Sequence, residues 1–135
     1  MKMEEKEEYF FDHEKLRVYQ KAVEFVEWVD NLLKKIKVKN STTDQIDRAS
    51  ESIVLNIAEG NGKFTPKDRC KYFDISRGSA MESAGCLDIF FAKKLIDNAV
   101  RREGKIILKD IVNMLMGLIK SNSDRSYEPG EEYKP

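Results

Sequence analysis

The sequence contains one histidine, two cysteines, three prolines and seven glycines in 135 residues, and it lacks the short motifs of common enzyme classes. Because His13 is the only imidazole, no set of Glu-x-x-His motifs can hold a metal between helices, and a Ser-His-Asp or Cys-His arrangement would have to use this one residue. No Walker loop, GxGxxG or CxxC motif occurs. We therefore expect no catalytic residue, no metal site and no cofactor, and thus a protein that is not an enzyme.

Long apolar runs and a secretory leader are also absent. No stretch approaches the roughly 18–20 apolar residues that span a bilayer. The amino terminus, MKMEEKEEYF, is acidic, whereas a signal peptide begins with basic and then apolar residues. Cys70 and Cys86 fall on one expected helix, about 24 Å apart at a rise of about 1.5 Å per residue, which is too far for a disulfide. These features predict a cytoplasmic protein with reduced thiols.

The sequence has no net charge, but its charges are unevenly placed. The chain holds 24 Lys and Arg residues and 24 Asp and Glu residues. The first ten residues carry an excess of two acids, as do residues 128–135, so the remaining body has an excess of four bases. This mild excess is well below the dense basic patch of a strong nucleic-acid binder.

Helical periodicity and capping signals predict four helices. Asp12 is an expected N-cap of the first helix, with Phe11 and Leu16 as a hydrophobic staple. Thr42 and Gln45 form an expected capping box, and Gly60 is an expected helix C-cap. Thr65 as a cap and Pro66 at the first helical position begin the third helix. The expected helices cover residues 13–37, 42–59, 66–97 and 100–120.

No segment alternates apolar and polar residues over the length of a strand, and the connections between the expected helices are short. Short connections favour antiparallel neighbours. The sequence therefore predicts an all-α protein, an up-down-up-down four-helix bundle that is antiparallel and left-handed. We expect an acidic N-terminal extension (1–10), the bundle (11–120) and a disordered C-terminal tail (121–135).

The third helix carries apolar residues on two opposite sides. One stripe, expected to face the core, consists of Phe73, Arg77, Ala80, Ala84, Leu87 and Phe91. A helix in an isolated bundle buries one stripe, and glycine inside a helix costs up to about 1 kcal/mol relative to alanine. The second stripe is therefore a candidate subunit interface, although it could instead close a thick core within one chain. Its members are Ile75, Gly78, Glu82, Gly85 and Ile89, with Ile96 beyond them.

A polar stripe runs beside the apolar stripe of the second helix. The apolar stripe consists of Ile46, Ala49, Ile53 and Ile57, and the polar one of Gln45, Arg48, Ser52, Asn56 and Glu59. Charged residues beside a core are seldom buried unless paired. One interpretation is a polar pocket formed by Arg48, Asn56, Glu59, Arg77 and Glu82. The other is a set of ion pairs and caps that fixes the register between helices or between subunits, in which loss of Arg48 or Glu59 would be costly if its ion pair is buried.

Two basic clusters are candidate phosphate contacts. One lies at the end of the first expected helix and the other at the start of the fourth, and solvated surface charge is the alternative for both. The candidates are Lys34, Lys35, Lys37, Arg101, Arg102 and Lys105.

Three segments resemble the bacterial family of four-helix-bundle or 23S rRNA-intervening-sequence proteins. They read LRVYQKAVEF (16–25), QIDRASESIVLNIAEGNGK (45–63) and YFDISRGSAMES (72–83). The resemblance implies a ring-like homopentamer of four-helix bundles. The sequence also resembles the accessory protein of diversity-generating retroelements. This resemblance implies a basic pentamer that binds nucleic acid and a reverse transcriptase. The signature positions that the resemblance marks are Gln45, Arg48, Asn56, Glu59, Arg77, Ser79 and Glu82.

Two functions fit these features. The first is a non-catalytic oligomer associated with RNA or a ribonucleoprotein, in which several subunits display modest basic patches together. The second is a protein–protein interaction or structural scaffold module that does not bind nucleic acid, which the neutral net charge favours.

Overall fold

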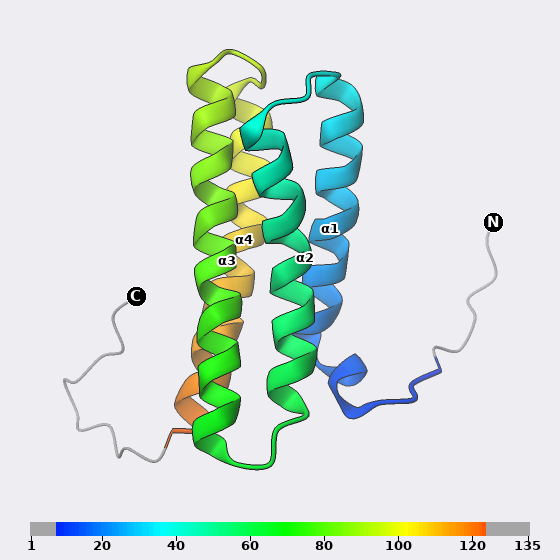
Figure 1. The fold of residues 1–135 in the computed structure, drawn as a ribbon, viewed down its shortest axis with the longest axis vertical. Coiled ribbons are helices and arrows are strands. Elements are labelled where there is room, and N and C mark those ends of the chain that lie inside the picture. Colours follow the sequence, from blue (N-terminus) through cyan, green and yellow to red (C-terminus); the bar gives the residue numbers. More distant parts are fainter. Residues whose placement is uncertain (1–7, 124–135) are drawn as a thin grey trace.

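Four helices pack side by side in the computed structural model, which describes residues 8–123. They are α1 (Arg17–Ile36), α2 (Ser41–Asn61), α3 (Pro66–Ala92) and α4 (Asn98–Ser121), and they run alternately up and down (Figure 1). The prediction of an all-α four-helix bundle is confirmed. The expected extension over residues 1–10 is described only from residue 8, and the expected disordered tail lies outside the described residues from residue 124 onward.

The α2–α3 turn follows the capping signals only in part. Thr65 caps α3 as predicted, because its hydroxyl accepts a 3.2 Å hydrogen bond from the amide of Asp68, with Pro66 at the first position. Gly60 does not end α2. It lies buried inside the helix, where an added Cβ would be 2.9 Å from the ring of Phe73, and the C-cap is Gly62. The two glycines therefore have different roles: Gly60 allows α2 and α3 to approach closely, and Gly62 ends α2.

Other helix ends differ from the sequence expectation. A short 3₁₀ turn over Asp12–Lys15 precedes α1, so Asp12 does not cap it, and Phe11 is 66% exposed and forms no staple. The capping box of α2 begins at Asn40, whose side chain accepts from the amide of Thr43. The expected third helix over residues 66–97 ends at Ala92, and α4 begins at Asn98.

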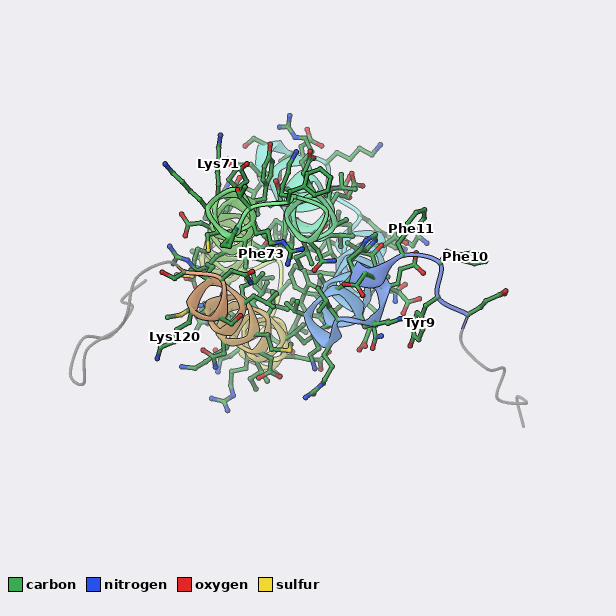
Figure 2. All side chains as sticks on the ribbon, turned by 90° about the horizontal axis from the view of Figure 1, so that it is seen from below. Tyr9, Phe10, Phe11, Lys71, Phe73 and Lys120 are labelled. Atoms are coloured by element: carbon green, nitrogen blue, oxygen red, sulfur yellow. The ribbon has the colours of Figure 1, made fainter. Side chains whose placement is uncertain are left out.

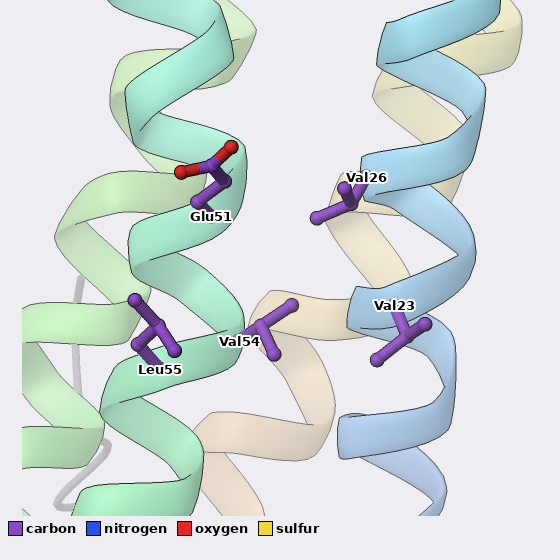
Figure 3. Close-up of a pocket in the computed structure, with 5 residues that line it drawn as sticks. All are labelled: Val23, Val26, Glu51, Val54 and Leu55. Carbon is purple, nitrogen blue, oxygen red and sulfur yellow. The ribbon is translucent and has the colours of Figure 1, made fainter.

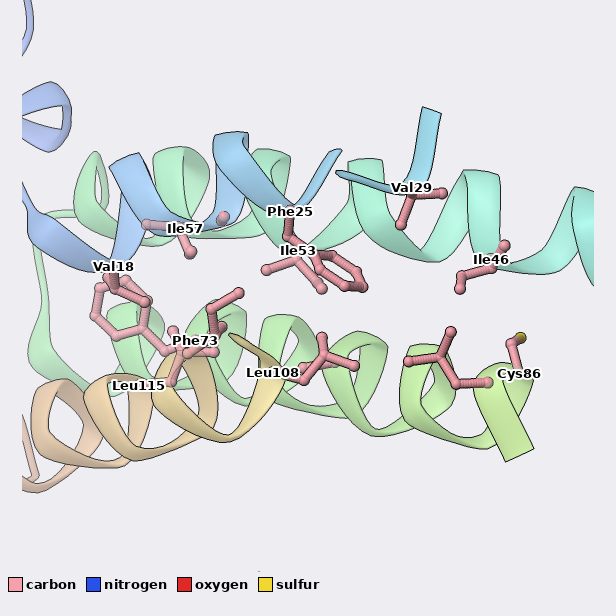
Figure 4. Close-up of a cluster of buried hydrophobic side chains, with 14 of the residues drawn as sticks. Val18, Phe25, Val29, Ile46, Ile53, Ile57, Phe73, Cys86, Leu108 and Leu115 are labelled. Atoms are coloured by element: carbon pink, nitrogen blue, oxygen red, sulfur yellow. The ribbon is translucent and has the colours of Figure 1, made fainter. Parts of the chain in front are cut away.

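The core of the bundle combines aliphatic and aromatic side chains from all four helices (Figure 4). The predicted core stripe of α2 is confirmed, since Ile46, Ala49, Ile53 and Ile57 are all buried. The buried side of α3 is rotated by about one position toward α2 relative to the expected core stripe. The buried residues of α3 are Phe73, Ser76, Ser79, Ala80, Ser83, Cys86, Leu87 and Phe90.

Buried serines explain this displacement. Ser76 Oγ donates a 2.8 Å hydrogen bond to the carbonyl of Ile53 on α2, and Ser83 Oγ donates to the carbonyl of Ser79. A small side chain whose hydroxyl is hydrogen-bonded can be buried at low cost and lets two helices approach closely. Arg77 and Phe91, which the sequence places in the core, lie at its margin instead, and Phe91 is 36% exposed.

Among the described residues, no helix combines the length and apolarity needed to cross a membrane.

Candidate functional site

The second stripe of α3 lies on the surface of the bundle. Ile75 and Ile89 are 44% and 40% exposed, although both are large and apolar. No atom of the chain lies within 4 Å of a Cβ built on Gly78 or Gly85, apart from the neighbouring backbone of their own helix. For these four residues, the alternative that the stripe closes the chain's own core is wrong. Only Ile96, at the end of the stripe, packs against that core.

The exposed stripe of α3 continues onto α2. Ser52 of α2 and Ser79 of α3 join the two helices through a 2.8 Å hydrogen bond between their hydroxyls. Arg48 precedes Ser52 by one turn and Glu82 follows Ser79 by one turn, so both lie on the same side of this bond along the antiparallel pair. Both side chains are exposed, and no ion pair joins either one to another described residue.

We call this surface the α2–α3 face. Its members are Arg48, Leu55, Ile75, Gly78, Glu82, Gly85 and Ile89, with Leu55 being 64% exposed. Along α3, two glycines lie between the isoleucines of this face and leave room for a second backbone to approach. Glu82 also influences the interior. Burial raises the pKa of the Cys86 thiol, and the charge of Glu82 raises it further.

The polar pocket, one of the two interpretations of the polar stripe of α2, is not formed by the side chains expected to line it. Arg48 and Glu59 are both exposed and lie on one helix, about 16 Å apart along its axis, so neither residue forms a buried ion pair with another described residue. Glu59 pairs at 3.4 Å with Lys63 in the turn that follows α2, and Arg77 pairs at 2.9 Å with Asp74 within α3.

What the polar stripe does form is a short network between α2 and α3. The amide nitrogen of Asn56 donates to the carbonyl and the hydroxyl of Ser52, at 2.8 and 3.0 Å, and Ser52 in turn meets Ser79. Gln45, at the start of the stripe, is exposed. These bonds can fix the register of α2 against α3, but the network contains no titratable group and no acid–base pair.

The two basic clusters lie at the same end of the bundle, the upper end in Figure 1, which carries the α1–α2 and α3–α4 turns. Residues 30–48 and 86–105 make up this end and hold ten Lys and Arg residues against six Asp and Glu residues. Lys34 pairs with Asp30, and Arg101 and Lys105 both pair with Asp88. Lys35, Lys37 and Arg102 are exposed.

An apolar groove lies on the surface between α1 and α2 (Figure 3). It has a volume of about 240 Å³ and is lined by Val23, Val26, Val54 and Leu55, with Glu51 at its edge. Val23 and Val26 recur at helical spacing in the sequence, but this spacing alone does not indicate a groove. The signal that could have found it is the width of the apolar surface of α1, which exceeds what one neighbouring helix covers.

The described residues also contain no group of three His, Cys, Asp or Glu side chains that could hold a metal. His13 lies between two aromatic rings, stacked on Phe11 at 6.0 Å and edge-on to Tyr19 at 4.7 Å. The α2–α3 face, the groove and the basic upper end are therefore candidate interaction surfaces.

Comparison with known proteins agrees with this fold. The sequence profile of the 23S rRNA-intervening sequence protein family matches residues 14–117, which is most of the chain. A crystal structure of a protein of unknown function from the S23 ribosomal protein family of Bacteroides thetaiotaomicron VPI-5482 is similar, with a TM-score of 0.72 and 24% sequence identity. The similarity covers 76% of this chain and 98% of that one. No curated protein matches the sequence.

Proposed function

This chain belongs to the 23S rRNA-intervening sequence protein family, and from that premise we propose that it is a non-catalytic homo-oligomer that associates with RNA or a ribonucleoprotein through the upper end of its bundle. The observation that carries the proposal is the meeting of the two basic clusters, which are more than sixty residues apart in sequence, at one end of the fold. RNA in the bacterial cytoplasm is the polyanion that this end would contact.

The charge distribution supports phosphate contact at the upper end. The described residues hold 20 bases and 17 acids, an excess of three, whereas the upper end alone has an excess of four. The rest of the described bundle is therefore slightly acidic. Lys35, Lys37 and Arg102 are exposed and extend the basic surface across two helices. Such a modest patch gains effective affinity when several subunits present it at once.

The α2–α3 face supports self-association. A contact that closes a ring joins two different surfaces of identical subunits. The α2–α3 face offers two exposed isoleucines, room beside Gly78 and Gly85, and two exposed charges of opposite sign, Arg48 and Glu82. Buried in a subunit contact, its apolar side chains would leave water. We propose a homopentamer, the number that the family resemblance implies.

The experiment compares two matched double variants for binding to a structured ribosomal RNA fragment. Lys35→Gln/Arg102→Gln removes one cation from α1 and one from α4 at the upper end. Lys21→Gln/Lys109→Gln removes one from each of the same helices, nearer the middle of the bundle. We expect the first variant to lower RNA affinity about tenfold or more and the second to change it little, since each phosphate contact contributes separately. Equal affinities in the two variants would contradict the assignment of the upper end.

The α1–α2 groove favours a second candidate function, a scaffold that binds protein. Its lining is almost entirely apolar, and such a groove suits the apolar side of a partner helix. RNA affinity separates the two candidates. A wild-type protein without measurable affinity for structured RNA at low salt would leave the scaffold as the better account.

A further inference from the structure

Three phenylalanine rings project into solvent at the lower end of the bundle, opposite the basic upper end. Phe10 is 75% exposed, Phe11 is 66% exposed, and Phe64 is 99% exposed. Phe10 and Phe11 precede α1, and Phe64 lies in the α2–α3 turn. Figure 2 looks onto this end and shows Phe10 and Phe11 at the margin of the bundle. Several exposed apolar rings at one end of a protein are a feature of interaction sites, so this end is a candidate binding surface.

Polar contacts hold the two aromatic segments at the same end. Asp12, next to Phe11, accepts a 3.3 Å hydrogen bond from the side chain of Asn61, three residues before Phe64. The amide of Phe10 donates to a carboxylate oxygen of Glu14 at 2.9 Å. These hydrogen bonds hold the backbone next to the rings in place, and this pre-organisation lowers the entropy cost of binding.

Cations accompany the exposed ring of the α2–α3 turn. Residues 59–72 hold four Lys and Arg residues against two acids. The side chain of Arg69 donates a 2.8 Å hydrogen bond to the carbonyl of Lys63 and so fixes the turn. Lys67 and Lys71 are exposed and are separated by one helical turn on α3, and Figure 2 shows Lys71 at the edge of this end.

We propose that the lower end binds single-stranded RNA, with an unpaired base stacked on Phe64, neighbouring bases on Phe10 or Phe11, and phosphates held by Lys67 and Lys71. Exposed aromatic rings beside cations are the combination that single-stranded nucleic acid requires, because each base has a face to stack and each phosphate a charge to neutralise. The proposal deepens the RNA-associated function and rests on it. It assigns base stacking to the lower end and leaves phosphate contact with folded RNA at the upper end.

A second protein copy is the alternative occupant of this end, and one observation disfavours it. The exposed side chains of the α2–α3 face are aliphatic and lie near glycines, as a close helix contact requires. The lower end has aromatic rings instead, with an excess of cations around the α2–α3 turn and an excess of acids beside Phe10 and Phe11. Sedimentation of the Phe64→Ala protein separates the two occupants.

The probe is a fluorescently labelled ten-nucleotide oligouridylate, which forms no stable duplex, titrated with the full-length protein. Three substitutions at one position separate stacking from apolar contact. Phe64→Ala removes the ring, Phe64→Leu keeps an apolar side chain without a ring, and Phe64→Tyr keeps the ring. We expect the Ala and Leu variants to bind about five- to a hundredfold more weakly and the Tyr variant to bind as the wild type does. Lys71→Gln should weaken binding and reduce its salt dependence.

Three results would overturn the proposal. One is unchanged oligouridylate affinity in the Phe64→Ala variant, and another is equal affinity in the Leu and Tyr variants. The third is a smaller oligomer in sedimentation of the Phe64→Ala protein, which would place the ring in a subunit contact. The upper-end pair Lys35→Gln/Arg102→Gln, measured with the structured RNA fragment, distinguishes the two proposals. If it has no effect while the Phe64 series behaves as expected, the upper-end assignment fails and the lower-end site stands.

Discussion

The indole of Trp28 lies directly against the backbone of Gly104. A Cβ built on Gly104 would stand 2.6 Å from Cη2 of Trp28 and 2.6 Å from Cδ1 of Leu87. The adjacent residue, Glu103, accepts a 2.7 Å hydrogen bond from the indole nitrogen of Trp28. Residue 104 must therefore be glycine for α4 to approach α1 and α3 this closely.

Gly104→Ala should destabilise the protein by about 1–3 kcal/mol, because two packed side chains must move to admit one methyl group. Gly117→Ala on the same helix is the matched control. No atom other than nearby backbone lies within 4 Å of a Cβ at that position, so the substitution should stabilise the helix by up to about 1 kcal/mol. Urea unfolding at one protein concentration measures both changes. Equal free energies of unfolding for the two variants would contradict the close approach.

The Cys86 thiol should make the stability of the protein fall at alkaline pH. Burial, and then the charge of Glu82, raises the pKa of this thiol in the folded chain above its ordinary value of 9.0. Above pH 9.0 the unfolded chain therefore loses its thiol proton first, and that ionisation favours unfolding. Cys86→Ala should show a shallower loss of melting temperature between neutral and alkaline pH than the wild type. Parallel profiles for the two proteins would contradict this linkage.

Charges placed on the α2–α3 face should prevent assembly without unfolding the subunit. Ile75→Asp/Ile89→Asp puts two carboxylates on a surface that the chain itself leaves exposed, so the fold should tolerate them. In a subunit contact the same carboxylates would be desolvated without partners. Sedimentation should show a smaller species with an unchanged helical circular dichroism spectrum.

Ile106→Asp is the control for that experiment. Ile106 is 55% exposed on α4, outside the α2–α3 face, and its substitution should leave the oligomer intact. Oligomers of one size in both variants would place the subunit contact elsewhere, and a monomeric wild-type protein would remove the assembly proposal.

The buried side of α3 shows why sequence pattern located the helices better than it located their contacts. Apolar periodicity favours Arg77 and Phe91 as core positions, whereas the bundle buries Ser76 and Phe90, each one residue earlier. A serine counts as polar in any hydrophobic pattern. Only the structure shows that the Ser76 hydroxyl reaches the carbonyl of Ile53. The direction of a helix is therefore easier to predict from sequence than its rotation about its own axis.

The candidate sites also differ in how far the sequence predicts them. The α3 part of the α2–α3 face was predictable, because Ile75 and Gly78 mark a second apolar stripe on a helix that buries only one in an isolated bundle. The contribution of Leu55 on α2 was not predicted. The basic upper end could also have been predicted, since alternating helix directions bring the end of α1 and the start of α4 together. The lower end was not, because the sequence pattern favours Phe11 as a staple against α1, and the 3₁₀ turn at Asp12 instead leaves the ring exposed.

The most direct test of the account is the salt dependence of RNA binding by the wild-type oligomer. Affinity for a structured ribosomal RNA fragment is measured as salt rises from about 50 to about 200 mM. The account predicts that the logarithm of the association constant falls linearly with the logarithm of the salt concentration, with a slope that corresponds to several released counterions. An affinity that stays constant over this range would contradict phosphate recognition, and with it the RNA-associated function.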